Sequence, residues 1–309
     1  MQAAIEEACA ALRAGALVAF PTETVYGLGA DARSEPAVRS IFAAKGRPAD
    51  HPLIVHLASI DALDAWAREV PAAALALFER FAPGPLTVIL NKRPEVLDVV
   101  TGGQPTVGLR VPDHPVALAL LEAFGSGIAA PSANRFGAVS PTTAAHVALE
   151  LGDAVALILD GGPCRVGVES TIVDLSGETP ALLRPGGVEV EAIEAVLGRS
   201  LASPRGGVRA PGMLPAHYAP RARVVAVDAR RLAEAVAAED GRVVVLGPVD
   251  VAGAPRIALS AEPAEAARGL YAALREVDAR GFEVAVVALP PPIGLGLAVA
   301  DRLRRAASR

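Results

Sequence analysis

The chain has 309 residues, which corresponds to about two domains of 100 to 200 residues each. Its residues are 52% hydrophobic, yet no uninterrupted apolar run reaches the ~18 residues that a membrane-spanning helix needs, so we expect a protein that does not cross a membrane. The formal net charge is -5, with 16 basic and 23 acidic residues in 1–220 and 13 and 11 in 221–309, which argues against a generally basic nucleic-acid binder.

The N-terminal segment has the pattern of an amphipathic helix. Ile5, Ala8, Cys9 and Leu12 recur at helical spacing, with two glutamates between them. This pattern is not that of a signal peptide, so we expect a cytoplasmic protein.

The cysteines and histidines predict no metal held by protein ligands. Cys9 and Cys164 have the spacing of neither a metal site nor a redox pair, and the five histidines form no HExxH motif. Magnesium held mainly by the phosphates of a substrate would leave no such pattern.

The first two-thirds of the chain alternate short β-type runs with amphipathic helical stretches, which is typical of a mixed α/β domain. A helix over 189–197 ends at Gly198, a residue favoured at helix C-termini. We expect a domain over 1–202. Its candidate strands are 17–20, 53–57, 87–90, 107–111, 128–130, 156–160, 171–175 and 181–184.

A Pro/Gly-rich connector over 203–220 leads to a second domain over 221–309. Strands over 223–227, 242–246 and 282–289, with a helix around 267–277, indicate a small Rossmann-like α/β unit. The run Gly294-Leu295-Gly296-Leu297 lacks the third glycine of a dinucleotide fingerprint, so we interpret it as a packing turn.

No Walker A lysine loop is present, yet several segments are suited to an anionic ligand. The first, 21–31, follows a strand and combines hydroxyls with glycines, which suits a ligand crevice at a strand's carboxyl end. Alone, this segment is better explained as an ordinary turn with a capping threonine.

The second segment contains Lys45 and Arg47 on the exit from a helix, followed by His51 and His56. Cations are favoured at helix C-termini in any case. A lysine point charge beside an arginine fork also suits a polyphosphate. Lys45 is one of only two lysines in the chain, which otherwise uses arginine.

The third and fourth segments carry an isolated arginine and a set of short polar groups. Arg110 stands in an apolar strand and needs an anionic partner, which is either a structural carboxylate or one from a substrate. Ser132 and Asn134 point to one side of an extended segment and can bind a nucleotide, although alone they are better explained by a turn followed by a helix cap at 140–142.

Together these segments resemble the threonylcarbamoyl-AMP synthase family, the YrdC-like proteins, in its long two-domain form. The resemblance covers 17–186 and continues through Pro211-Gly212-Met213, His217-Tyr218-Ala219-Pro220 and Asp301-Arg302-Leu303. Its most specific part is the lysine-x-arginine pair followed by serine-x-asparagine. The resemblance implies a YrdC-like mixed, twisted-sheet catalytic domain followed by the small Rossmann-like domain.

The resemblance also implies the site residues. ATP would be bound by Lys45, Arg47, His51, Thr106, Ser132, Asn134, Ser140, Arg184 and Tyr218, with Lys45 and Arg47 as the catalytic pair. L-threonine would be bound by Thr24, His56, Arg110, Ala130 and Ser170. The family pattern usually has a basic residue after Pro-Gly-Met, whereas this chain has Leu214-Pro215-Ala216, which puts a charge contact from the connector in doubt.

The implied reaction converts L-threonine, bicarbonate and ATP, with Mg²⁺, into threonylcarbamoyl-AMP and pyrophosphate. The unstable product would pass to a transferase that modifies a tRNA adenosine, and weak contact with tRNA is compatible with this role. Two alternatives remain at this point: carbamoyl-adenylate formation, and an RNA-binding module without ATP turnover. The acidic balance of 1–220 argues against the second.

Overall fold

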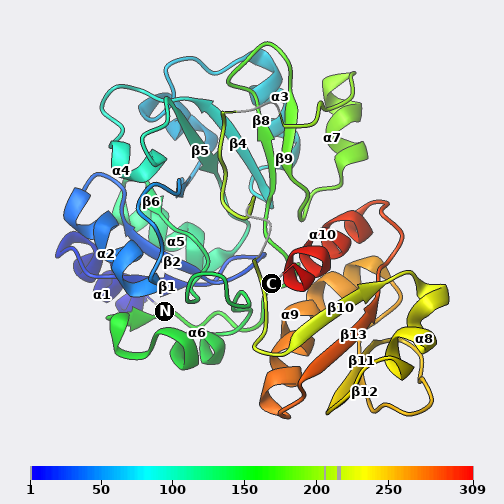
Figure 1. Cartoon of the computed structure of the whole chain (residues 1–309). Coiled ribbons are helices and arrows are strands. Elements are labelled where there is room, and N and C mark those ends of the chain that lie inside the picture. Colours follow the sequence, from blue (N-terminus) through cyan, green and yellow to red (C-terminus); the bar gives the residue numbers. More distant parts are fainter. Residues whose placement is uncertain (1, 205–206, 214–216, 309) are drawn as a thin grey trace. The chain divides into compact units, whose positions relative to one another are not determined.

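The computed structural model describes residues 2–204, 207–213 and 217–308 (Figure 1). Two compact units are formed, and each is described by itself. The first contains the chain up to Phe136, Pro141–Arg165 and Glu169–Met213; the second contains Gly137–Ser140, Val166–Val168 and the chain from 214 onward. Within the described ranges, no helix has both the length and the apolarity needed to cross a membrane.

The first unit is built on a nine-stranded mixed sheet in the order β7-β1-β2-β6-β3-β5-β4-β8-β9. The sheet contains parallel pairs, such as β3 with β5 and β4 with β8, and antiparallel pairs, such as β4 with β5. The strands are β1 (Val18–Phe20), β2 (Gly27–Asp31), β3 (Ile54–His56), β4 (Leu86–Asn91), β5 (Thr106–Arg110), β6 (Ile128–Ala129), β7 (Leu157–Ile158), β8 (Thr171–Asp174) and β9 (Ala181–Arg184).

The helices of this unit cover the sheet with their apolar stripes. In α1 the buried residues are the Ile5, Ala8, Cys9 and Leu12 predicted from spacing. The α-helices are α1 (Gln2–Arg13), α2 (Glu35–Lys45), α3 (Ala72–Phe81), α4 (Asp98–Thr101), α5 (Pro115–Phe124), α6 (Ala144–Leu151) and α7 (Val190–Leu197), and the 3₁₀ turns are η1 (Ile60–Ala65) and η2 (Gly152–Ala154).

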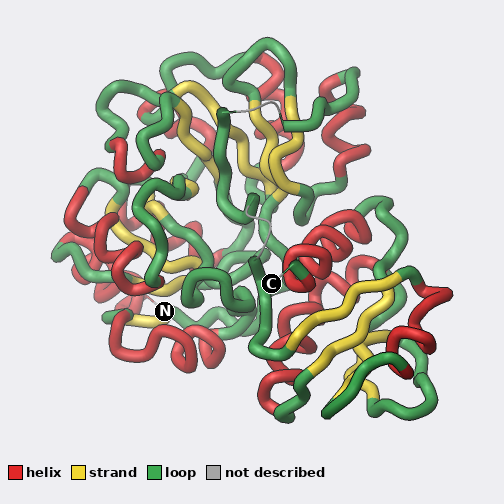
Figure 2. Tube along the Cα trace, viewed as in Figure 1, coloured by secondary structure: helices red, strands yellow, loops and turns green. Residues whose placement is uncertain are grey.

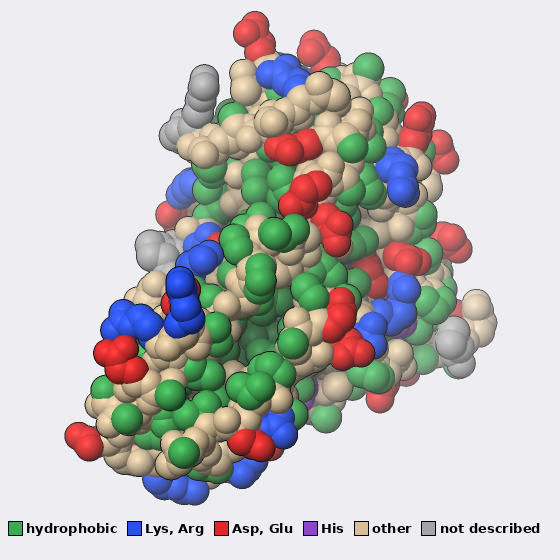
Figure 3. Space-filling view, turned by 90° about the vertical axis from the view of Figure 1, so that its right-hand side faces the viewer, with side chains coloured by type: hydrophobic (Ala, Val, Ile, Leu, Met, Phe, Trp, Pro, Cys, Tyr) green, Lys and Arg blue, Asp and Glu red, His purple; other side chains and the backbone are tan. Residues whose placement is uncertain are grey.

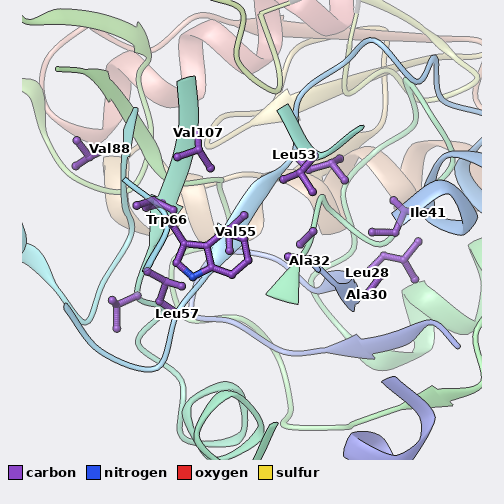
Figure 4. Packing of buried hydrophobic residues seen from close by; sticks show 14 of the residues in the cluster. Leu28, Ala30, Ala32, Ile41, Leu53, Val55, Leu57, Trp66, Val88 and Val107 are labelled. Carbon is purple, nitrogen blue, oxygen red and sulfur yellow. The ribbon is translucent and has the colours of Figure 1, made fainter. Parts of the chain in front are cut away.

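One face of the central strands forms the main hydrophobic core. Val55, Val88 and Val107 lie there with Trp66, whose side chain is 2% exposed (Figure 4). Gly127 makes this packing possible, because a Cβ at that position would come within 2.4 Å of the Trp66 ring. This face is therefore closed and holds the fold together.

The opposite face of the same strands carries a smaller apolar cluster. Ile54, Ile89, Ile172 and Leu183 pack there with Ala210 of the connector, and Val208 and Met213 lie against them. Figure 2 shows the described part of this connector as loop, without helix or strand. Residues 208–213 of the connector are thus packed on the sheet face that also carries the polar residues described below.

The second unit has a four-stranded parallel sheet in the order β10-β13-β11-β12. Its elements are β10 (Arg223–Val227), η3 (Ala229–Arg231), α8 (Leu232–Ala237), β11 (Val243–Gly247), β12 (Arg256–Ala258), α9 (Pro263–Ala279), β13 (Val284–Ala288) and α10 (Leu295–Ala307). The predicted Rossmann-like character is confirmed. The turn before α10 is a packing turn, since a Cβ at Gly296 would lie 2.2 Å from the Pro291 carbonyl oxygen.

Two strands differ from the sequence prediction. Segment 21–31, interpreted as a loop, contains β2, which pairs with β1 and β6. Strand β12 was not predicted.

Of the connector, residues 205–206 and the Leu214-Pro215-Ala216 departure lie outside the described residues. Thr143, rather than the predicted 140–142 run, supplies the side-chain cap of α6.

Candidate active site

Strand β5 aligns the candidate residues on the sheet face away from the main core. Every second residue of β5 points to the same face of the sheet, and on this face these residues are Thr106, Gly108 and Arg110. A Cβ on Gly108 would contact Ile89, Thr87 and Ile54, which identifies this face as the one with the smaller apolar cluster. Thr106 and Arg110 are four residues apart, so about 13 Å separates the two ends of this row.

Arg110 lies at the carboxyl end of β5 in a buried setting, with 4% of its surface exposed. Its Nη2 donates to Glu23 Oε1 at 2.7 Å and to Thr24 Oγ1 at 2.8 Å, while Nε donates to the Gly84 carbonyl at 3.4 Å. Asp113 donates its backbone N–H to the other Glu23 oxygen. Within the described part of the chain, the Nη1 group makes no hydrogen bond, so one arm of the guanidinium is left for an acceptor from a ligand.

His56 stands directly opposite Arg110 on β3. Burial and the Arg110 charge lower the pKa of His56 to about 3, so the ring is neutral at physiological pH. Its Nδ1 is buried and has no hydrogen-bond partner among the described residues. The ring packs edge-on against Phe20, with 5.9 Å between centroids. An unpaired ring nitrogen beside Arg110 is suited to a polar ligand group.

Lys45 is the last residue of α2 and is also buried, with 3% exposed. The following Gly46 adopts a left-handed conformation and ends the helix. Lys45 Nζ donates to the carbonyl oxygens of Ser132 and Asn134, both at 2.5 Å. Burial, and then the nearby Arg47, hold the pKa of Lys45 well below its usual value. The lysine therefore fixes the serine-x-asparagine loop, and in its protonated form it has a third N–H for another acceptor.

Arg47 and His51 occupy the loop after α2. Arg47 Nη2 donates to the Pro52 carbonyl at 2.8 Å, which holds the guanidinium close to the chain. The His51 ring lies 5.3 Å from that of Phe136, and burial followed by the Arg47 charge lowers the pKa of His51. The Arg47 guanidinium of this loop is thus held in a fixed position.

The segment with Ser132 and Asn134 is held by backbone bonds on both sides. Ala130 donates its N–H to the Ile54 carbonyl, and Ala133 donates to the Tyr26 carbonyl. The Asn134 side chain donates to the Arg135 carbonyl at 2.8 Å. These bonds, with the two from Lys45, give the loop a defined shape next to β3.

Ser170 and Arg184 lie together at the adjoining ends of β8 and β9. Arg184 donates to the Ser170 carbonyl oxygen from Nε and Nη2, and Nη2 also lies 3.0 Å from Ser170 Oγ. Its Nη1 donates to the carbonyl oxygen of Pro211 in the connector at 3.0 Å. Thr87 Oγ1 is 2.8 Å from Ser170 Oγ. Arg184 therefore links Ser170 to the connector.

The connector is also anchored near the Thr106 end of β5. The Gln104 side chain exchanges two hydrogen bonds with the Arg209 backbone, and the Arg209 side chain contacts Asp50 at 3.1 Å and the Gly102 carbonyl. The connector is thus fixed to the first unit at both ends of the polar row.

Comparisons with known proteins identify the family of this chain. Residues 10–186 match the family described as "Telomere recombination", and 188–308 match "Threonylcarbamoyl-AMP synthase, C-terminal domain". The threonylcarbamoyl-AMP synthase of Pyrococcus abyssi is 46% identical over 96% of this chain and 91% of its own length; that of Bacillus subtilis is 43% identical over 98% and 92%. The chain belongs to the threonylcarbamoyl-AMP synthase family.

A solved structure extends the similarity to the whole fold. The crystal structure of P. abyssi Sua5 complexed with L-threonine superposes with a TM-score of 0.93 and 45% identity, covering 98% of this chain and 94% of that one. The predicted family and fold class are therefore confirmed.

Two residues that the family resemblance places at the nucleotide belong to the second unit. Ser140 is fully buried. Tyr218 is 1% exposed and has a positive φ of 62°, which is rare for a residue with a side chain. Its ring stacks on Tyr271 and lies 4.8 Å from the Arg302 guanidinium. In this conformation the tyrosine packs within its own unit.

Among the described residues, no group of three or more histidine, cysteine, aspartate or glutamate side chains is placed to hold a metal ion. The acidic residue nearest Arg110, Glu23, uses both oxygens in bonds to Arg110 and Asp113.

Sequence reasoning missed three side chains that complete this site. Glu23 neutralises Arg110, Thr87 contacts Ser170, and Gln104 anchors the connector. Glu23 stands next to Thr24 in the first segment, which was the one available signal for it. Thr87 and Gln104 are ordinary strand and turn residues whose partners are 83 and 105 residues away, so only the fold reveals them.

Proposed function

We propose that this protein forms threonylcarbamoyl-AMP and pyrophosphate from L-threonine, bicarbonate and ATP. The observation that carries this proposal is the arrangement on one sheet face. A buried arginine with one unengaged arm stands at the carboxyl end of β5, and a loop clamped by a buried lysine lies beside β3. An amino acid carboxylate fits the first and an anionic nucleotide fits the second.

L-threonine is bound by Thr24, His56, Arg110, Ala130 and Ser170 in this proposal. The carboxylate bonds to Arg110 Nη1, while the neutral His56 ring and the Ala130 segment face the rest of the molecule. Because Glu23 already neutralises Arg110, the pocket adds no large excess of positive charge and accepts a zwitterionic amino acid.

ATP is bound at the other side of the row. Lys45 and Arg47 act on the phosphates, with His51, Thr106, Ser132, Asn134 and Ser140 around the nucleotide. Arg184 and Tyr218 also belong to the proposed ATP-binding residues. To contact ATP, each has to give up contacts that it makes in this structure. Mg²⁺ enters with ATP and offsets phosphate charge; no protein ligand is assigned to it.

The chemistry requires no protein nucleophile. The lone pair of the deprotonated threonine amine attacks the carbon of bicarbonate, with loss of the bicarbonate hydroxyl and an amine proton as water, or the carbon of CO2, with loss of an amine proton to solvent, to give a carbamate. A carbamate oxygen then attacks the α-phosphorus, and the bond from that phosphorus to pyrophosphate breaks. The protein contributes by holding the two reactants in line and by stabilising phosphate charge with Lys45 and Arg47.

The remaining parts of the proposal concern organisation and partners. The catalytic domain comprises 1–202, the connector 203–220 and the Rossmann-like domain 221–309. The protein acts in the cytoplasm and supplies its product to a transferase that modifies a tRNA adenosine. Against a pure RNA-binding role, acidic and basic side chains are interspersed on the face shown in Figure 3 rather than gathered into one basic surface.

The test is pyrophosphate release by the purified protein. Release is expected only when ATP, L-threonine and bicarbonate are all present, and release that ignores threonine would refute the assignment. Replacing Lys45 by alanine should lower the rate about 100-fold or more, because one charge-stabilising group is lost.

The matched control for this variant is Lys92→Ala, which removes the other lysine. Lys92 bonds to Asp98 and to the Val96 carbonyl, outside the proposed site. Its variant should keep near-normal activity. Equal losses in both variants would show that Lys45 has no special role at the phosphates.

A further inference from the structure

Thr87 is a buried polar residue for which the mechanism above gives no role. It is fully buried in β4, between β5 and β8. Val88 pairs with Leu109, so Thr87, one step along the ladder, stands opposite Arg110. Its methyl group faces the position where a Gly108 Cβ would be, which places the side chain on the same sheet face as Arg110 and His56.

The Thr87 hydroxyl has one hydrogen-bond partner within the described part of the chain. This partner is Ser170 Oγ, at 2.8 Å, and the geometry allows either oxygen to be the donor. Ser170 Oγ also accepts from Arg184 Nη2 at 3.0 Å, and arginine can only donate. Each of the two hydroxyls carries one proton, and only one of these two protons takes part in the hydrogen bond between them.

The second proton has no acceptor from the described residues, although both hydroxyls are fully buried. If Ser170 donated to Thr87, the unpaired proton would lie on Thr87, inside a strand that is paired on both sides. If Thr87 donates, Ser170 accepts twice and its own proton is left at the residue just before β8. Only the second arrangement leaves the proton at a strand end, where a ligand can supply an acceptor. A buried O–H without an acceptor is costly, so a ligand that supplies one is favoured.

We propose that Thr87 is a positioning residue of the threonine site, which by donating to Ser170 turns the Ser170 hydroxyl into a dedicated donor for the substrate carboxylate. This inference rests on the proposed function. The carboxylate is the acceptor because two donors are left unengaged on the same face, on either side of β4: Ser170 Oγ–H, just before β8, and Arg110 Nη1, at the end of β5. One carboxylate has an oxygen for each.

The experiment uses the full-length protein and four variants. Thr87→Val keeps the shape and removes the hydroxyl, and Thr87→Ser keeps the hydroxyl. Ser170→Ala removes the proposed donor, and the fourth variant combines Ser170→Ala with Thr87→Val. Binding of L-threonine is measured by calorimetry, and KM and kcat by threonine-dependent pyrophosphate release. Thermal unfolding is followed for every variant.

Thr87→Val should raise the Kd and KM for L-threonine about tenfold, because a charge-assisted hydrogen bond loses its orientation. The KM for ATP and kcat should change little. Thr87→Ser, which keeps the hydroxyl, should bind L-threonine about as tightly as the wild-type protein. Since Thr87 acts through Ser170, adding Thr87→Val to Ser170→Ala should weaken binding no further.

Additive losses in the double variant, or equal losses for ATP and threonine, would show that Thr87 is only structural and would overturn the inference. L-2-aminobutyrate, which keeps the carboxylate and lacks the hydroxyl, is tested as an inhibitor. Thr87→Val should weaken its inhibition by the same factor, and an unchanged inhibition would overturn the carboxylate assignment. If the wild-type protein neither binds threonine nor releases pyrophosphate, the proposed function itself has failed.

Discussion

Replacing Glu23 by glutamine tests the buried ion pair on which the candidate threonine pocket is built. The Glu23 and Arg110 side chains are 1% and 5% exposed, and their charged atoms are 2.7 Å apart. Glutamine keeps the size of the side chain but leaves the arginine charge buried without a counter-charge. Breaking a buried pair by removing one partner costs about 3 to 5 kcal/mol of stability.

The single tryptophan makes this cost measurable in the first unit. Trp66 is 2% exposed in the main core, so its fluorescence reports the unfolding of that unit in guanidinium. The control is Arg39→Gln, which breaks an ion pair with Glu35 whose side chains are 59% and 51% exposed. Such an exposed pair contributes about 0.5 kcal/mol.

A double variant sharpens the test. Glu23→Gln and Arg110→Gln each leave one buried charge, whereas the combination leaves none. The double variant should therefore be destabilised by less than the sum of the two single changes. Additive losses, or a Glu23→Gln protein within about 1 kcal/mol of the wild type, would refute the view that these two charges depend on each other.

Two further predictions concern stability. Because the folded pKa of His56, about 3, lies below the ordinary 6.5, the unfolded chain binds more protons between these values, so stability should fall as pH drops from 6.5 towards 3. His56→Phe should weaken this pH dependence, as measured by urea midpoints at pH 7 and 5; an unchanged dependence would contradict the buried, neutral ring. Gly296→Ala should destabilise the protein by about 1 to 3 kcal/mol, because the new Cβ would meet the Pro291 carbonyl oxygen at 2.2 Å. Gly247→Ala, with open space around its Cβ, is the control; similar circular dichroism melts for the two would contradict the close approach.

The elements predicted well from the sequence are those whose local pattern agrees with their burial. The stripe in α1 and the buried β-type runs of β4 and β5 are of this kind. Strand β2 was missed because Gly27-Leu28-Gly29-Ala30-Asp31 has poor strand propensity. Its glycines are required by packing instead, since a Cβ at Gly29 would lie 2.9 Å from Phe20 and Ile128. Such contacts are set by distant segments and leave no local pattern.

The candidate site was predictable as a set of residues but not as a network. Arg110 was expected to have either a structural carboxylate or a substrate carboxylate as its partner. The structure contains the first, since Glu23 occupies Nη2, and it leaves Nη1 for the second. The two alternatives are therefore compatible. The distance of 87 residues between Glu23 and Arg110 explains why the sequence could not distinguish them.

Lys45 could likewise be identified as a candidate from the sequence, whereas its contacts could not. Its rarity in an arginine-rich chain indicated a position where arginine would not serve, and the structure supplies a physical reason. A compact ammonium can donate to the Ser132 and Asn134 carbonyls at once from a helix end, and it still has a third N–H.

Arg184 extends this reasoning to the connector. Its guanidinium donates to the Ser170 carbonyl, to Ser170 Oγ and to the Pro211 carbonyl. Contact between Arg184 and a nucleotide therefore requires at least one of these bonds to be exchanged. Loss of the Pro211 bond would remove one of several contacts that hold the connector on the sheet face, whereas loss of the Ser170 bonds would remove one of the two donors that orient its hydroxyl. Binding of the nucleotide at Arg184 would thus act on the connector or on the threonine pocket through the same side chain.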